Sequence, residues 1–277
     1  MTDVTPAALG APLVVVQNVQ KHYGEFQALT DIDLTVHKGE VVVIIGPSGS
    51  GKSTLCRTIN RLETITSGSI TIDGEELPAE GKGLAQLRAD VGMVFQSFNL
   101  FAHLTILENV TLGPIKVRGM KKADAEKEAM QLLERVGVAK QASKLPAQLS
   151  GGQQQRVAIA RALAYEADIL LMDEPFASVD AQTRFDLEDL LLDLRRQLGI
   201  SIVVVTHDID EAVYLSDRVT VLSGAPASVA EVVDVHLDAP REQIGTKADP
   251  RFSEYRTRIL KRIRRPELAA VRKGGDA

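Results

Sequence analysis

Residues 46–53 carry the clearest chemical signal in this chain of 277 residues, because they read GPSGSGKS. An apolar run at 41–45 precedes them and a helical pattern at 54–61 follows, which is the context of a phosphate-binding loop. The glycines let the backbone turn closely around an anion, and the start of the helix favours negative charge. We therefore predict, in preference to an ordinary Gly/Ser turn, that Lys52 reaches the β- and γ-phosphates of a nucleoside triphosphate and that Ser53 binds Mg²⁺.

Two adjacent carboxylates, Asp173 and Glu174, follow an apolar run at residues 169–172. In phosphate-loop folds, an acid at the end of such a strand can hold Mg²⁺. A carboxylate beside the metal can polarise the water that attacks the γ-phosphate. Read alone, the pattern fits a solvated acidic turn about equally well, and the phosphate loop favours the catalytic interpretation.

Residues 149–153 read LSGGQ and begin another helical pattern. Ser150 can cap this helix, and Gly151 and Gly152 leave its first N–H groups uncovered, which makes a second anion-binding helix end. The loop at 46–53 already holds the phosphates of the chain's own nucleotide. A second clamp therefore predicts a second subunit, with an ordinary Ser-capped helix as the alternative.

Three single residues could complete such a site. Gln96 and His207 each follow a predicted strand and could contact water, Mg²⁺ or the γ-phosphate, and Tyr23 could stack on an adenine ring. Single residues of these types are usually structural, so they acquire a role only together with the motifs around them.

The pattern of apolar residues predicts how these groups are positioned. Strands are predicted at 13–18, 31–36, 41–45, 69–72, 91–95, 169–172 and 202–206, and helices at 123–136 and 185–198. Between 99 and 163 the pattern is helical throughout. A β-rich start, a helical insertion and an α/β finish predict a phosphate-loop sheet with a helical lobe inserted in it.

Composition narrows the class of protein. The single cysteine, Cys56, excludes an internal disulfide, fits a reducing compartment and is expected to be a core residue. We find no apolar run near ~18 residues and no secretory signal in the first residues. The net charge of −5 argues against nucleic acid as a partner.

Tyr23, GPSGSGKS, Gln96, LSGGQ, ILLMDE and His207 occur in the order found in the nucleotide-binding subunits of ATP-binding cassette (ABC) transporters, which the chain resembles from about residue 13 to 222. The resemblance implies an α/β fold, a P-loop NTPase sheet with an N-terminal antiparallel β subdomain and an inserted helical lobe. It implies an ATPase on the cytoplasmic face of the cell membrane that forms a head-to-tail homodimer with ATP at the interface. Its other partners would be integral-membrane permease subunits and, indirectly, a solute-binding protein.

The resemblance also implies a role for each site residue. Glu174 would be the general base and His207 the γ-phosphate sensor, while Gln96 would be catalytic, contact Mg²⁺ and report to the permease. Mg²⁺ would be held by Ser53, Gln96 and Asp173. The ATP contacts would be Tyr23, Gly46, Ser48, Gly49, Gly51, Lys52, Ser53, Thr54, Ser150, Gly151, Gly152, Gln153 and Asp180. One motif departs from the family pattern, because Val179 stands where leucine usually precedes Asp180, which puts the coupling between the two sites in doubt.

Two parts of the sequence resemble subfamilies that transport different solutes. Residues from about 14 to 164 resemble polar amino-acid importer ATPases, whereas residues from about 165 onward look more like nitrate, taurine and aliphatic-sulfonate importer subunits. In the family, the permease docks on the helical lobe near Gln96, and we expect Phe98, Leu100 and Phe101 to be its anchors here. Because this lobe lies in the part of the chain that resembles amino-acid importers, we favour amino acids as the substrate. Soluble ABC proteins of DNA repair usually carry long coiled coils and translation-type factors carry two cassettes, and this sequence has neither.

We expect a frayed segment at 1–12, an ABC ATPase domain at 13–240 with its helical lobe at about 97–163, and a basic helical extension at 241–277. The helix expected at 249–265 places Phe252, Tyr255, Ile259 and Ile263 on one face and most of its basic residues elsewhere. This pattern fits a helix packed on its own domain, which we favour, or a helix that lies on anionic lipid.

Overall fold

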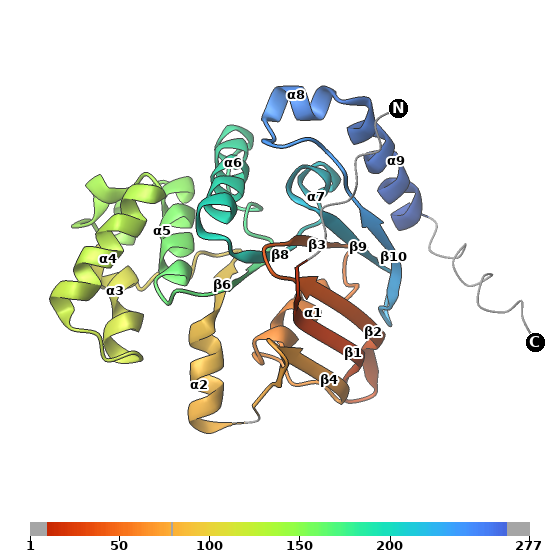
Figure 1. Ribbon diagram of the computed structural model, residues 1–277, viewed down its shortest axis with the longest axis horizontal. Coiled ribbons are helices and arrows are strands. Elements are labelled where there is room, and N and C mark those ends of the chain that lie inside the picture. The colour runs from red at the N-terminus through yellow and green to blue at the C-terminus, as the bar shows by residue number, and fades with distance from the viewer. Residues whose placement is uncertain (1–9, 79, 265–277) are drawn as a thin grey trace, which may run out of the picture.

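Two β-sheets and a set of surrounding helices make up the computed structural model, which describes residues 10–78 and 80–264 (Figure 1). The strands are β1 Pro12–Tyr23, β2 Phe26–His37, β3 Val41–Ile45, β4 Ser67–Ile72, β5 Glu75–Glu76, β6 Val91–Phe95, β7 Ile169–Asp173, β8 Ser201–Val205, β9 Arg218–Leu222 and β10 Val229–Asp234. The helices are α1 Lys52–Ile59, α2 Gly81–Asp90, α3 Ile106–Lys116, α4 Lys122–Arg135, α5 Gly151–Leu163, α6 Ala181–Leu198, α7 Ile209–Leu215, α8 Gln243–Ala248 and α9 Pro250–Arg264, with 3₁₀ turns at Ala139–Gln141 and Pro146–Gln148.

The larger sheet has the strand order β10-β9-β3-β8-β7-β6. All of its neighbouring strands are parallel except β10, which is antiparallel to β9. The strands β3, β7 and β8 are buried along their whole length, which explains their continuous runs of Val, Ile and Leu. Parallel strands bring their carboxyl ends to one edge, so the residues after β3, β6, β7 and β8 meet there.

The smaller sheet is antiparallel, with the order β2-β1-β4-β5. Its strands β1 and β2 extend beyond the predicted 13–18 and 31–36. Asn18 (φ 47°) and Asp31 (φ 45°) have left-handed backbones that interrupt the regular strand, and pairing between β1 and β2 continues beyond them. The two strands meet in a hairpin at Gly24. These irregularities disturb the alternation that a strand prediction relies on, and pairing between the strands overrides them.

A lobe of α3, α4 and α5 lies between β6 and β7 in the sequence and projects to one side of the sheets (Figure 1). This arrangement agrees with the predicted insertion. The predicted helices 123–136 and 185–198 correspond to α4 and α6, and α6 begins four residues earlier because Asp180 caps it. We did not predict α2, α7, β5, β9 or β10, whereas α8 lies within the helical extension predicted at 241–277.

The C-terminal helix α9 contacts α7, β9 and β10. Phe252 and Ile259 are buried there, and Tyr255 and Ile263 pack against the same cluster. Of the two alternatives for this helix, the apolar face therefore packs on its own domain. Two predictions fall partly outside the described residues: the frayed segment at positions 1–9, and the helical extension from position 265 onward.

Within the described part of the chain, no helix is both long and apolar enough to cross a membrane. Cys56 is fully buried, and this burial raises the pKa of its thiol well above the ordinary range. Cys56 is therefore a core residue, as expected.

Candidate functional site

The phosphate loop connects β3, at the centre of the larger sheet, to α1. Gly49 (φ 75°) and Gly51 (φ 80°) adopt left-handed conformations that residues with a Cβ rarely take. A Cβ on Gly51 would lie 2.9 Å from the Cδ2 of Leu29, so this glycine is also required by packing. Among the described residues, no side chain caps the start of α1. Its first N–H groups are therefore available to an anion.

Lys52 lies folded back over this loop. Its Nζ donates hydrogen bonds to the carbonyl oxygens of Gly46 (3.0 Å) and Pro47 (2.8 Å). Burial lowers the pKa of Lys52, and the nearby carboxylates of Glu174 and Asp173 oppose that shift. A partly desolvated ammonium at the mouth of an amide-lined loop is suited to bind phosphate oxygens.

Ser53 and Asp173 meet although 120 residues separate them in the sequence. The Ser53 hydroxyl donates to Asp173 Oδ1 at 2.6 Å, and the guanidinium of Arg57 lies 3.0 Å from Asp173 Oδ2. Asp173 is buried, so its charge needs these partners. A hydroxyl and one carboxylate supply the oxygen ligands that Mg²⁺ prefers, with the remaining positions left for water and phosphate. The donor set fits the predicted metal site.

Glu174 and His207 lie at the ends of two adjacent parallel strands, β7 and β8. The His207 Nδ1 is 3.3 Å from Glu174 Oε2. Glu174 has a left-handed backbone (φ 48°), held in part by its N–H, which donates to the carbonyl of Val205 at 2.9 Å. Strained backbone of this kind is commonly found at functional sites, where the surrounding structure enforces it. The Glu174 side chain contacts His207, whereas Asp173 contacts Ser53.

Several of these groups line one cleft of about 610 Å³, and Asp173 adjoins it through its hydrogen bond with Ser53. Its walls include the predicted residues Tyr23, Ser48, Gly49, Gly51, Lys52, Ser53, Thr54, Glu174 and His207. The lining also includes Phe26, which we did not predict. Tyr23 and Phe26 pair across the β1–β2 hairpin and are 44% and 56% exposed, so both can contact a planar ligand, although Lys21 Nζ stands over one face of the Tyr23 ring, 4.5 Å from its centroid. The glycine at position 24, which is typical of a turn, is the sequence signal that could have identified Phe26.

The predicted residues at the starts of α5 and α6, 150–153 and Asp180, form a second cluster that does not line this cleft. Ser150 caps α5 by accepting from the N–H of Gln153 at 3.3 Å. Asp180 caps α6 by accepting from the N–H of Thr183 at 3.0 Å. A Cβ on Gly152 would lie 2.2 Å from the Cγ2 of Thr183. The starts of α5 and α6 are therefore in close contact, and Gly152 makes that contact possible.

Gln96 lies between the two groups of residues. It follows β6 and is exposed, and its carbonyl oxygen accepts a hydrogen bond from the hydroxyl of Ser178 at 3.2 Å. Because β6 pairs with β7 in register at Phe95 and Asp173, Gln96 comes to the same sheet edge as Glu174. Its side chain does not line the cleft, so the structure leaves its predicted contact with Mg²⁺ as a prediction.

Comparison with known proteins identifies relatives along much of this chain. The model of the family described as "ABC transporter" matches residues 29–177. The glutamate transport ATP-binding protein GluA of Corynebacterium glutamicum is 63% identical over 207 residues, which cover 75% of this chain and 85% of that relative. The glutamate/aspartate import ATP-binding protein GltL of Escherichia coli K12 is 46% identical over 229 residues, 83% of this chain and 95% of that relative.

Solved structures agree with the fold. The ATP-binding cassette MJ0796, in a dimeric post-hydrolysis state bound to ADP and Pi, is 39% identical, with a TM-score of 0.73 over 81% of this chain and 99% of that one. The protein cbiO1 of Clostridium perfringens, part of the ABC transporter complex cbiONQ, is 28% identical, with a TM-score of 0.76 over 95% of this chain and 99% of that one. The predicted fold class is confirmed.

Proposed function

The chain belongs to the ABC transporter family as an ATP-binding protein, and from this premise we propose that it hydrolyses ATP to drive the import of polar amino acids such as glutamate. The observation that carries the proposal is the sheet edge where the Ser53–Asp173 pair, Lys52 and the Glu174–His207 pair meet. This edge offers, in one cleft, groups suited to phosphate, to a metal ion and to water.

Each residue of the cleft has a distinct task in this proposal. Lys52 and the amides of the loop bind the β- and γ-phosphates, and Tyr23, with Phe26 beside it, stacks on the adenine ring. Ser53 and Asp173 hold Mg²⁺, which when bound supplies neutralising charge to the phosphates. Glu174 accepts a proton from the attacking water, and His207 contacts the γ-phosphate. The products are ADP and phosphate, and no covalent intermediate with the protein forms.

We propose further that two copies assemble head to tail. The cluster around Ser150, Gly151, Gly152 and Asp180 resembles a second phosphate clamp, yet it lies outside the cleft of its own chain. In the dimer it would face the γ-phosphate of the ATP held by the other copy. Val179, which stands where the family usually has leucine, lies next to this clamp, since a Cβ on Gly151 would be 3.9 Å from the Cγ1 of Val179.

The partner of such a dimer is an integral-membrane permease, with a solute-binding protein acting through it. We place the chain at the cytoplasmic face of the membrane, where ATP is available. The printed names of the relatives favour amino acids as the solute. The resemblance of residues after about 165 to nitrate and sulfonate importers remains a prediction, and the permease decides between the two.

Co-expression tests this proposal. The chain is produced with an amino-acid permease or with a sulfonate-type permease, and each complex is captured through the permease and placed in vesicles with ATP. We expect capture by the amino-acid permease and ATP-dependent glutamate uptake. Selective capture by the sulfonate-type permease would refute the amino-acid assignment. If neither complex hydrolysed ATP, the proposed ATPase activity itself would be refuted.

A further inference from the structure

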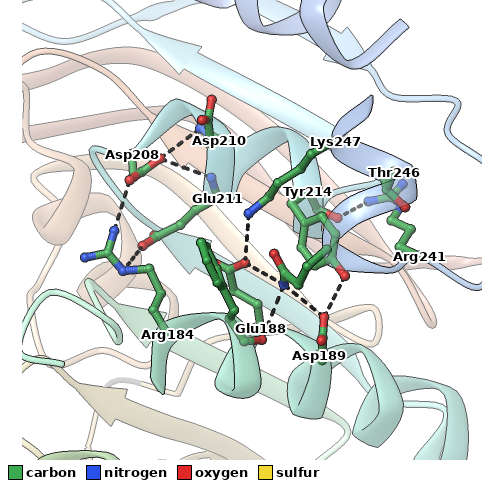
Figure 2. A network of polar contacts seen from close by, with 12 residues as sticks. Arg184, Glu188, Asp189, Asp208, Asp210, Glu211, Tyr214, Arg241, Thr246 and Lys247 are labelled. Atoms are coloured by element: carbon green, nitrogen blue, oxygen red, sulfur yellow. Dashed lines mark hydrogen bonds and ion pairs between the residues drawn. The ribbon is translucent and has the colours of Figure 1, made fainter. Parts of the chain in front are cut away.

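A buried network of charged side chains joins α6, α7 and α8, outside the cleft described above (Figure 2). Its two innermost carboxylates are Glu188 of α6 and Glu211 of α7, which are 1% and 5% exposed. Carboxylates at such depth are retained only where hydrogen bonds and opposite charges compensate for lost water. The question is what Glu211 and its partners do for the neighbouring loops.

Glu211 fixes the loop of His207 through Thr206. The Thr206 hydroxyl donates to Glu211 Oε2 at 2.5 Å and accepts from the N–H of Asp208 at 3.0 Å. One buried hydroxyl therefore holds the residues on both sides of His207, and Glu211 sets the direction in which that hydroxyl points. His207 itself is largely exposed, so its position depends on this backbone anchor.

Arg184 connects the same loop to α6. Its Nη1 lies 3.1 Å from Asp208 Oδ2, and its Nε lies 3.5 Å from Glu211 Oε1 (Figure 2). Arg184 is in the first turn of α6, where its N–H donates at 2.9 Å to the carbonyl of the cap residue, Asp180. The guanidinium thus connects α6, which Asp180 caps, to the loop that carries His207.

On the other side of the network, residues of α8 contact Glu188 and Asp189 of α6. Gln243 Nε2 donates to Glu188 Oε2 at 3.0 Å and to Asp189 Oδ1 at 2.9 Å, and Lys247 Nζ lies 3.8 Å from Glu188 Oε2. The Lys247 ammonium also stands over the ring of Phe185, 4.1 Å from its centroid. Gln243 and Lys247 compensate Glu188 more strongly than Arg184 does, and the direct contacts of Arg184 are with Glu211 and Asp208.

We propose that Arg184 and Glu211 are positioning residues that couple the loop of Asp180 to the loop of His207. This inference rests on the proposed function, because it assigns to these loops their parts in ATP hydrolysis. In the proposed dimer, Asp180 belongs to the interface and His207 to the chain's own ATP. A displacement of the interface loop would then move His207 relative to Glu174 through the rigid start of α6 and the Arg184–Glu211 contact.

ATPase kinetics of the Glu211→Ala and Arg184→Met variants test the coupling. Neither side chain lines the cleft, so we expect an unchanged KM for ATP and a loss in kcat of roughly tenfold to a hundredfold, the usual cost of a misplaced catalytic group. Glu211→Gln retains an acceptor for Thr206 and should restore part of kcat. The double variant should lose little more than either single one, because both act through one contact.

Arg195→Met is the matched control. Arg195 lies on the same helix, has similar exposure and pairs with Asp217 at 2.6 Å, far along α6 from Asp180. We expect its kcat to stay near that of the unmodified chain. An equal loss in the control, an additive double variant or a raised KM with unchanged kcat would overturn the proposal.

A second readout does not require hydrolysis, and therefore separates failure of this inference from failure of the proposed function. The ring signal of His207 in a ¹H–¹³C NMR spectrum, assigned with a His207→Gln variant, reports its surroundings. We expect this signal to move in Glu211→Ala and Arg184→Met and to stay in place in Arg195→Met. A signal unmoved in the first two variants would overturn the coupling, whether or not the unmodified chain hydrolyses ATP.

Discussion

Asp173 and Glu174 are neighbours in the sequence, yet the structure gives them different surroundings. Asp173 is buried and receives hydrogen bonds from Ser53 and Arg57. Glu174 is partly exposed, has a left-handed backbone and contacts His207. The hydrogen bonds fix the orientation of Asp173, as a metal ligand requires, whereas the freer Glu174 beside the cleft is suited to accept a proton.

We therefore predict that Glu174→Gln retains ATP binding and slows hydrolysis by ~10²–10⁴-fold, the usual contribution of a positioned base. The amide keeps the size and shape of the carboxylate but cannot take the proton. Steady-state ATPase assays measure the rate, and equilibrium binding of a fluorescent ATP analogue measures affinity. A rate within a few-fold of the unmodified chain would remove Glu174 from this role.

At the scale of elements, the contact between α5 and α6 depends on a single missing methyl group. Gly152→Ala would place its Cβ 2.2 Å from Thr183 Cγ2, so either the Thr183 side chain must leave its bond with Asp180 or the two helix starts must move apart. We expect this variant to lose ATPase activity, since it displaces the Ser150 cap and the Asp180 cap together. Thr183→Ser removes that Cγ2 and keeps the hydroxyl that bonds Asp180.

The double variant Gly152→Ala/Thr183→Ser should recover part of the activity that Gly152→Ala loses, and Thr183→Ser alone should stay near the unmodified rate. Recovery would identify the methyl clash as the cause. If the double variant were as inactive as Gly152→Ala, the effect of the new methyl group would lie elsewhere, for example in the second phosphate clamp itself.

The packing of α7 against α6 has a pH signature. Burial, with help from the negative charges of Asp208 and Glu188, raises the pKa of Glu211 from 4.5 to about 7, against the opposing hydrogen bond from Thr206 and the charge of Arg184. The folded chain then binds more protons at this site than the unfolded chain between these values. The contribution of Glu211 to stability therefore falls as pH rises from about 4.5 to about 7.

Glu211→Gln removes this titration. We predict that the stability of the variant relative to the unmodified chain rises across that pH range, by on the order of 1–3 kcal/mol, and is constant above it. Urea unfolding of both chains at several pH values measures the difference, in which the titration of all other groups largely cancels. A difference that does not depend on pH would contradict the raised pKa.

The elements were predicted unevenly, and for identifiable reasons. The strands β3, β6 and β7 were located to within a residue because they are short, apolar and bounded by turns. In contrast, β1 and β2 were predicted too short, since their left-handed residues and bulges interrupt the alternation. The site residues at strand ends came from motif order, and the glycine at 24 is a local signal beside Phe26, whereas the Arg184–Glu211 pair depends on a tertiary contact with no local pattern.

At the scale of the whole molecule, we expect the permease to contact the helical lobe. Phe101 is 44% exposed, whereas Phe98 and Leu100 are partly buried against the core, and the ring of Phe98 lies near Gly151. Of the three expected anchors, Phe101 is therefore the side chain most available to a partner. Exposed aromatic residues often supply much of the binding energy of an interface.

We predict that Phe101→Ala weakens co-purification with the permease and leaves basal ATPase unchanged. Leu62→Ala, which truncates a side chain of 45% exposure just after the C-terminal end of α1 and outside the helical lobe, is a suitable control and should retain binding. Equal losses in both variants, or none in Phe101→Ala, would place the permease contact on another face.

The whole-molecule arrangement explains why two phosphate-binding helix ends occur in one chain. One end, at Gly51, opens into the cleft, and the other, at Ser150, lies outside it. If a second copy brings its Ser150 to this cleft, both ends act on one ATP. The central claim is therefore that every ATP site belongs to two chains.

Complementation between two inactive variants tests this claim most directly. Lys52→Ala disables the phosphate loop and Ser150→Arg disables the clamp, and a heterodimer of the two contains one site with both lesions and one with neither. The account predicts that mixing them restores part of the ATPase activity that each lacks alone. If heterodimers form, as verified by capture through two different tags, and ATPase activity does not recover, each chain hydrolyses ATP within its own site and the account is contradicted.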